Sequence, residues 1–153
     1  MSGWQVGAAE IGGLLADRSL QQVTGQAADG VPGLARAHQT CASARVLLLN
    51  DPDNAFVLAY DAARQACTAL LAHQGLRPTA GGGHVAVERA VRAQFGAVFV
   101  AYGGLRRRRN EIEYPSHPDE AVSHDEAVAA VDSVEAIIAA ADKLLPHLIL
   151  FGS

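Results

Sequence analysis

Lysine, aromatic residues and cysteine are scarce in this sequence of 153 residues. Arginine outnumbers lysine eleven to one, and aromatic residues make up only 5% of the chain. The two cysteines, Cys41 and Cys67, are too few and too widely spaced for a disulfide framework or a zinc site. Both lie within apolar helical patterns, so we expect inert, buried thiols. We expect no cofactor and no bound metal.

Long apolar runs and a basic leader are also missing. The stretch near the N-terminus is only mildly apolar and contains Glu10, so it does not predict a signal peptide. No apolar run approaches the ~18 residues that a membrane span requires. We therefore expect a cytoplasmic protein with no membrane partner. The net charge of −4 excludes a broad cationic coat, so the arginine run at 106–109 is the candidate basic surface.

The composition favours helices. Half of the chain is hydrophobic and 30 residues are alanine, which is typical of close-packed helices. A single domain of this length buries about 68–70% of the surface that its unfolded chain exposes. We expect an all-α, antiparallel up-and-down bundle of five to six helices, with no strand. Residues 31–148 would form the bundle, and residues 1–30 would form an N-terminal helix and linker packed on it.

Periodicity and capping signals place the individual helices. The third is the best defined, because Asp51 can cap it, Pro52 suits its first position and Gly75 suits the residue after its end. In the last helix, Ser123 and Glu126 form a capping box. The spacing of apolar residues predicts helices over 6–24, 34–49, 52–74, 84–95, 97–114 and 123–145.

The segment 105–115 carries the densest polar pattern. Placed on a helix, it separates into three groups. The group expected to face the bundle is Val98, Leu105 and Ile112. The group expected to face solvent is Arg107, Arg108 and Glu111. Between them, an arc of about 140° holds Arg106, Arg109, Asn110, Glu113 and Tyr114.

Two interpretations of this arc follow from the residues alone. Two guanidinium groups beside an amide and a phenol could hold a phosphate or the edge of a ribose. Alternatively, Arg107 with Glu111 and Arg109 with Glu113 are helical ion pairs on a solvated face. Spacing alone favours the second interpretation.

Three features that follow one another along the sequence together resemble a known protein family. The first is the long helix AFVLAYDAAR at 55–64, continuing to ALL at 69–71. The second is its exit GLRP at 75–78, followed by His84, which we expect near the start of the next helix with access to solvent. The third is RRRRNEIEYP at 106–115. Over residues 34–145 the chain resembles the HEPN-domain family, small helical proteins associated with nucleotidyltransferases and RNA-targeting toxin or defence systems.

The resemblance implies a site as well as a fold. In the catalytic branch of the family, an arginine, commonly followed by a polar residue such as asparagine, precedes a histidine by four to six residues. The pair forms a metal-independent ribonuclease site, usually across a homodimer. Arg109 and Asn110 match the start of this motif, but Tyr114 stands where the histidine is expected, and His117 lies beyond Pro115. A tyrosine with a pKa near ~10 is a poor general base, so we expect RNA binding without efficient cleavage unless His117 reaches the site.

The resemblance therefore implies an RNA-associated homodimer that works with a nucleotidyltransferase-type partner in a toxin–antitoxin or defence module. The candidate catalytic residues are Arg109, Asn110, Tyr114 and His117. The candidate RNA or phosphate contacts are Arg106, Arg109 and Glu113. Asp61 and Arg64 are candidate contacts to the arc or to a partner chain. In the alternative hypothesis the protein is a non-catalytic dimerisation or interaction module, in which Arg109 pairs with Asp61 or Glu113.

Overall fold

The computed structural model describes residues 6–81, 83–117 and 121–153. Residues 1–5 of the expected N-terminal segment and 118–120 of the expected loop before the last helix lie outside the described residues. The helices are α1 (Ala8–Ala16), α2 (Val31–Leu47), α3 (Pro52–His73), α4 (Gly83–Phe95), α5 (Val100–Glu113) and α6 (His124–Leu144). Short elements lie between them: strands β1 (Leu20–Gln22) and β2 (Leu76–Pro78), and 3₁₀ turns η1 (Gly25–Ala27), η2 (Ala97–Phe99) and η3 (Leu145–His147).

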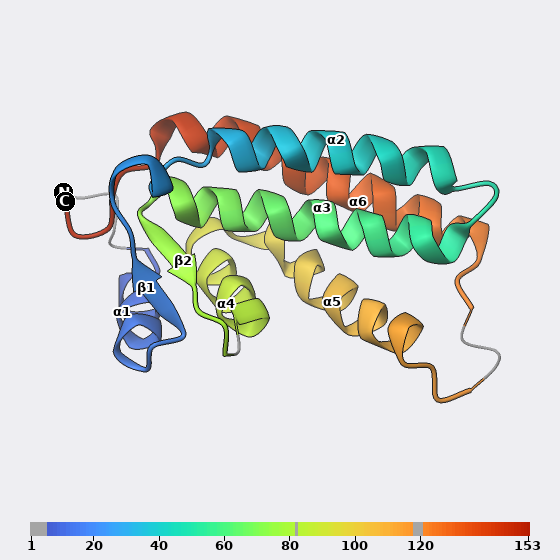
Figure 1. The fold of residues 1–153 in the computed structure, drawn as a ribbon, viewed down its shortest axis with the longest axis horizontal. Coiled ribbons are helices and arrows are strands. Elements are labelled where there is room, and N and C mark those ends of the chain that lie inside the picture. The colour runs from blue at the N-terminus through green and yellow to red at the C-terminus, as the bar shows by residue number, and fades with distance from the viewer. Residues whose placement is uncertain (1–5, 82, 118–120) are drawn as a thin grey trace.

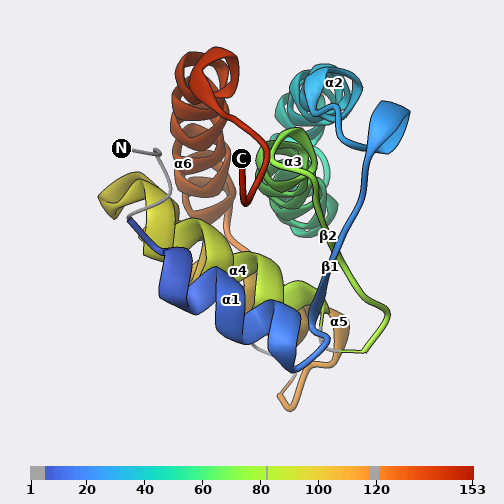
Figure 2. The same cartoon turned by 90° about the vertical axis from the view of Figure 1, so that its left-hand side faces the viewer.

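The expected all-α fold class is confirmed. Figure 1 shows α2, α3, α5 and α6 alternating in direction along the long axis of the molecule. Helices α1 and α4 lie side by side across one end, as Figure 2 shows from that end. Helix α3 contacts α2, α4, α5 and α6, so it is the central element. None of the described helices combines the length and the apolar character needed to cross a membrane.

Local capping explains the two long helices that begin after α2. The Asp51 side chain accepts a hydrogen bond from the Asn54 backbone N–H at 3.2 Å, which begins α3 as expected. Ser123 Oγ accepts from the Glu126 N–H at 3.1 Å at the start of α6. Gly75, with φ 73°, ends the α3 segment because few other residues adopt the left-handed region.

Alanine and cysteine make the centre of the bundle compact. Helix α3 buries six alanines together with Phe56, Tyr60, Cys67 and two leucines. Cys41 and Cys67 are both buried, as expected, and burial raises the pKa of each thiol. These thiols are therefore protonated near neutral pH.

The prediction that the chain contains no strand is wrong. Helix α1 ends at Ala16, after which Arg18 has a φ of 65° and turns the chain into β1. Strands β1 and β2 pair antiparallel, with Leu20 opposite Pro78. The buried side chain of Leu20 belongs to the apolar pattern that predicted a helix over 6–24, and Leu76 of β2 is buried as well. Three residues per strand are too few to show a period of two in the sequence.

Candidate functional site

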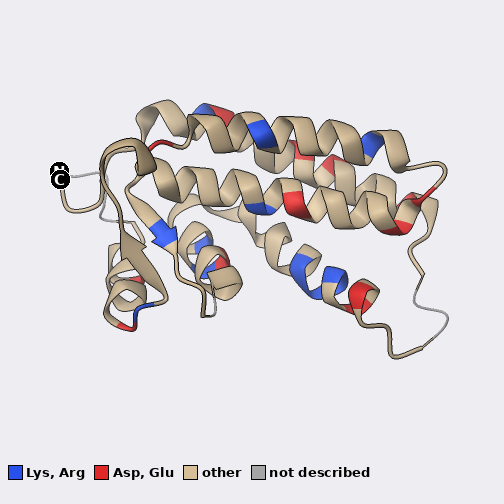
Figure 3. Ribbon diagram, viewed as in Figure 1, with Lys and Arg blue, Asp and Glu red and all other residues tan. Residues whose placement is uncertain are grey.

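Three residues of the predicted arc line one cavity at the junction of α3, α4 and α5. This basic cavity has a volume of about 280 Å³, and its lining residues are Tyr60, His84, Val85, Arg106, Arg109 and Asn110. The structure therefore places Arg106, Arg109 and Asn110 together and adds an imidazole from α4. Figure 3 shows the basic positions along α5 and the acidic position at its C-terminal end.

Arg109 is the cation in this cavity whose hydrogen-bonding capacity is least used. Its guanidinium carbon lies 5.9 Å from the centre of the Tyr60 ring. Its Nη2 is 4.0 Å from Glu113 Oε1, the limit of an ion pair. Its Nε is buried without a hydrogen-bond partner among the described residues. A buried donor without an acceptor is uncommon, and the accessible part of this weakly paired guanidinium, whose side chain is 32% exposed, is available to bind an anion.

Arg106 is held in place by a carboxylate of α4 that does not line the cavity. Its Nε donates to Glu88 Oε2 at 3.0 Å, and Glu88 is only 6% exposed. A side chain at Gly103 would collide with the Glu88 carboxylate, so the glycine allows α4 and α5 to approach at this pair. Arg92 also lies 3.5 Å from Glu88. The carboxylate therefore positions Arg106 at the wall of the cavity and offsets part of its charge.

His84 is the site residue that sequence reasoning placed on the surface without a role. Its Nδ1 lies 3.2 Å from the Tyr60 hydroxyl, and the residue is exposed, as expected. Burial lowers the pKa of His84, and the positive charges of Arg64, Arg109 and Arg106 lower it further, while Asp61 opposes them. An imidazole with a lowered pKa is neutral at pH 7.

A chain of hydroxyl groups connects His84 to the core. The Tyr60 and Tyr102 hydroxyls are 3.4 Å apart, and the two rings are stacked with their centres 5.7 Å apart. Tyr102 is fully buried, and this burial raises the pKa of its hydroxyl, which keeps its proton. Both hydroxyl protons are used when Tyr102 donates to Tyr60 and Tyr60 donates to His84 Nδ1. From this order of donors we infer that neutral His84 carries its proton on Nε2.

Tyr114 and His117 do not line the basic cavity. Tyr114 follows the last turn of α5, is 78% exposed, and donates its backbone N–H to the Asn110 carbonyl at 2.9 Å. His117 is exposed in the segment after Pro115. Glu113 is exposed and is near only Arg109 among the described ion pairs. The structure thus separates Arg109 and Asn110 from the two residues expected to complete their motif.

The expectation that Arg108 faces solvent is wrong. Its Nε and Nη2 donate to the two carboxylate oxygens of Glu126 at 2.6 and 3.2 Å, so it joins α5 to α6. A helical projection of α5 alone cannot reveal this partner on another helix. Glu111 is exposed as expected, but its carboxylate accepts from Arg108 at 3.2 Å, in place of the predicted pairing with Arg107.

Val98 also departs from its expected position facing the bundle. It is 43% exposed because it belongs to the 3₁₀ turn η2, which breaks the continuous helix expected over 97–114. Leu105 is buried and Ile112 packs partly against the core, as expected. The projection was therefore correct for the two apolar residues that are part of α5.

Asp61 and Arg64 lie on the side of α3 that faces His84. Both side chains are half-buried, and their charges act on the imidazole in opposite directions. Arg64 also lines a second hollow that His84 shares. The expected contact between Asp61 and Arg109 is not formed among the described ion pairs.

No family model, curated protein or solved structure matches the chain.

Proposed function

We propose that this protein is a HEPN-like RNA-binding protein that holds a phosphate of single-stranded RNA in the basic cavity. The observation that carries the proposal is the buried Nε of Arg109, which has no acceptor in the described part of the chain. Arg106 stands beside it at the wall. Hydrogen bonds from guanidinium groups to phosphate are among the strongest in proteins, because both partners are charged.

The neutral donors of the cavity suit a nucleotide. His84 presents Nε2–H, and Asn110 offers an exposed amide that can bond to a ribose hydroxyl. Tyr114 lies one turn beyond Asn110, and its exposed ring is a surface on which an unpaired base can stack. A single small cavity on an acidic protein fits a flexible strand better than the regular phosphate rows of a duplex.

The resemblance to the HEPN family supplies the biological context of the proposal. It implies a homodimer that works with a nucleotidyltransferase-type partner in a toxin–antitoxin or defence module. Asp61 and Arg64 remain candidate contacts to such a partner. If the protein is instead a non-catalytic interaction module, the arginines serve an interface and RNA does not bind.

A second candidate function, metal-independent RNA cleavage, is favoured by the imidazole of His84 in the cavity. In this reaction the ribose 2′-hydroxyl gives its proton to His84, the bond from 2′-oxygen to phosphorus forms, and the bond to the 5′-oxygen breaks. Water then protonates the departing 5′-oxygen. The step requires an unprotonated Nε2, whereas the hydroxyl chain places the proton there. The geometry thus supports binding more strongly than cleavage.

The test is a titration of labelled single-stranded RNA, in the presence of a chelator, followed by fluorescence anisotropy and by gel analysis of the RNA. The matched variants are Arg109→Gln and Arg107→Gln, because both remove one charge from α5 and Arg107 is exposed outside the cavity. We expect Arg109→Gln to weaken binding by about tenfold or more and Arg107→Gln by less than about threefold. Equal losses of RNA affinity in the two variants would contradict a specific binding site at Arg109.

The same samples separate the remaining functions. RNA that stays intact with wild-type protein supports binding without cleavage. Cleavage that His84→Gln abolishes and His117→Ala preserves would establish the second candidate function. A change of oligomeric state in Arg109→Gln, with no RNA binding by the wild type, would overturn the proposal in favour of the interaction module.

A further inference from the structure

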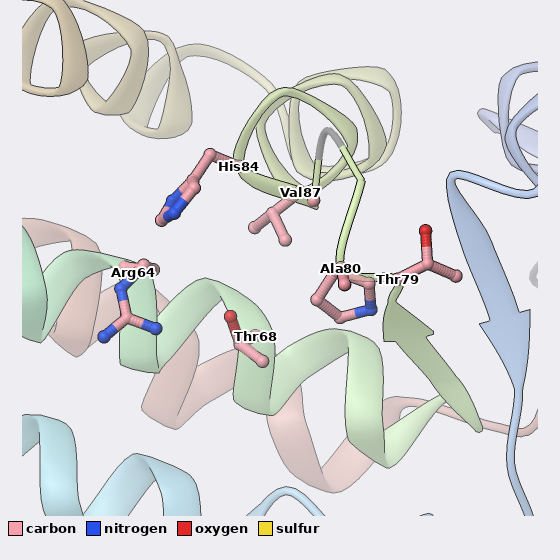
Figure 4. Close-up of a pocket in the computed structure, with 8 residues that line it drawn as sticks. Arg64, Thr68, Thr79, Ala80, His84 and Val87 are labelled. Atoms are coloured by element: carbon pink, nitrogen blue, oxygen red, sulfur yellow. The ribbon is translucent and has the colours of Figure 1, made fainter.

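His84 lies between two hollows. On one side is the basic cavity, and on the other is a second hollow of about 250 Å³, here called the adjoining hollow. Figure 4 shows His84 and Arg64 at one side of the adjoining hollow and Thr79 and Ala80 at the other. Each hollow lies just below the usual size range of small-molecule pockets, so each fits part of a ligand.

The adjoining hollow differs chemically from the basic cavity. Its apolar lining includes Pro78 and Val87, and its hydroxyl groups come from Thr68 and Thr79. The Thr79 hydroxyl donates to the Arg18 carbonyl at 2.7 Å, so it is already used in holding β2 against the turn before β1. Arg64 is the only arginine in its lining. Such a wall accepts an uncharged, partly apolar group better than a second phosphate.

Gly83 contributes to the shape of the adjoining hollow. A Cβ at this position would lie 3.1 Å from Pro78 Cβ, closer than ordinary van der Waals contact. The glycine therefore lets the start of α4 approach β2, which closes one side of the hollow and directs His84 toward α3.

We propose that the adjoining hollow binds the base of the nucleotide whose phosphate lies in the basic cavity. The inference rests on the proposed function and names its binding unit as a nucleoside monophosphate. His84 lines both hollows, and the planar guanidinium of Arg64 can stack on a base in the adjoining hollow. Among the described residues no carboxylate lies within ion-pair distance of Arg64, so a ligand does not have to displace one.

The test is a competition assay that displaces labelled single-stranded RNA from the full chain. The competitors are inorganic phosphate, ribose 5-phosphate, and the 5′- and 3′-monophosphates of the four nucleosides. We expect at least one nucleoside monophosphate to compete about tenfold better than ribose 5-phosphate, because only it fills both hollows. Preference among the four bases would then identify the specificity of the adjoining hollow.

Variants that fill the hollow complete the test. Ala80→Leu adds volume at an exposed position, and Thr68→Leu adds volume from α3, whereas Thr68→Ser leaves the hollow open as the matched control. We expect both leucine variants to remove the advantage of the nucleotides over ribose 5-phosphate and to preserve competition by ribose 5-phosphate itself. Thermal melting checks that each variant is folded.

The outcomes distinguish base binding in the adjoining hollow from phosphate binding in the basic cavity. Equal competition by ribose 5-phosphate and every nucleotide, with no effect of the leucine variants, would overturn the base-binding inference and leave phosphate binding intact. Failure of the wild-type protein to bind RNA or any phosphate ester would overturn the inference together with the proposed function.

Discussion

The hydroxyl of Tyr60 lies 3.2 Å from Nδ1 of His84, and this contact joins the central helix α3 to the start of α4. Tyr60 is 2% exposed, so its position is fixed by the core. The imidazole is consequently oriented by a buried group, although His84 also lines two hollows. Residues held in this way bind a ligand with little loss of side-chain entropy.

RNA affinity should depend on the protonation of His84. Burial and the neighbouring arginines lower the pKa of His84, and a phosphate bound in the basic cavity would raise it again. A pKa that is higher in the complex than in the free protein makes binding tighter as the pH falls through the pKa of the complex. We expect RNA affinity to rise as the pH is lowered from 7.5 to 6. Fluorescence anisotropy at constant ionic strength measures this change.

His84→Gln and His117→Ala provide the controls for this pH dependence. Glutamine keeps an amide donor near the position of Nε2 but does not titrate, so the rise should disappear. His117 is exposed outside the basic cavity, so its removal should leave the rise unchanged. An unchanged pH profile in His84→Gln would assign the titration to another group.

Tyr102→Phe should change the tautomer of the His84 imidazole, although Tyr102 acts on it only through Tyr60. The substitution removes the donor to Tyr60, which frees the Tyr60 hydroxyl to accept from His84 Nδ1. We expect nitrogen chemical shifts of His84 to move from the Nε2–H tautomer toward a mixture. The free energy of unfolding should fall by about 0.5–1.5 kcal/mol for the lost hydrogen bond. Identical shifts in wild type and variant would show that the hydroxyl chain does not set the tautomer.

Two neighbouring glycines of α5 give a matched test of the packing behind Arg106. Gly103→Ala places a methyl group against the buried Glu88 carboxylate, which must move. At Gly104 a Cβ would lie 3.9 Å from Arg107 Nη2, which is ordinary van der Waals contact. We expect Gly103→Ala to destabilise the protein by about 1–3 kcal/mol and to weaken RNA binding. Gly104→Ala should be neutral or stabilising by up to about 1 kcal/mol. Urea unfolding compares them, and equal stabilities would contradict the close approach of α4 and α5.

The Arg108–Glu126 pair should contribute to stability and not to RNA binding. Arg108 is about one fifth exposed and its bidentate bonds join α5 to α6, so removal of its charge should cost about 1 kcal/mol after allowance for solvent screening. A double-mutant cycle of Arg108→Gln and Glu126→Gln measures the coupling. If Arg108→Gln weakened RNA binding as much as Arg109→Gln, the assignment of these two arginines to different roles would be contradicted.

Local signals predicted the helices and only part of the site. Asp51 and Ser123 cap helices through neighbours three residues away, so the sequence was sufficient to place both starts. The Arg106–Asn110 segment was recognised because its residues share one helix. His84 was not, because its role depends on Tyr60 from another helix, and no periodicity links the two. The glycine run before His84 was the available signal, since it indicates an unusual approach of the chain.

The strands and the partner of Arg108 were missed for a related reason. Strands of three residues carry too little pattern, and their pairing joins segments 58 positions apart, as Leu20 does with Pro78. Glu126 follows Arg108 by 18 residues and begins another helix. Contacts of this kind follow from tertiary packing, which a helical projection does not contain.

We propose above that an RNA phosphate is bound by the guanidinium group of Arg109, whose Nε has no acceptor among the described residues. The most direct measurement follows the arginine Nε–H resonances by NMR during titration with a short single-stranded RNA, with Arg109→Gln used to assign the signal. The account predicts that the Arg109 signal shifts strongly, while those of Arg106 and Arg108, whose Nε atoms already donate to Glu88 and Glu126, shift much less. RNA binding that leaves the Arg109 signal unchanged would contradict the account.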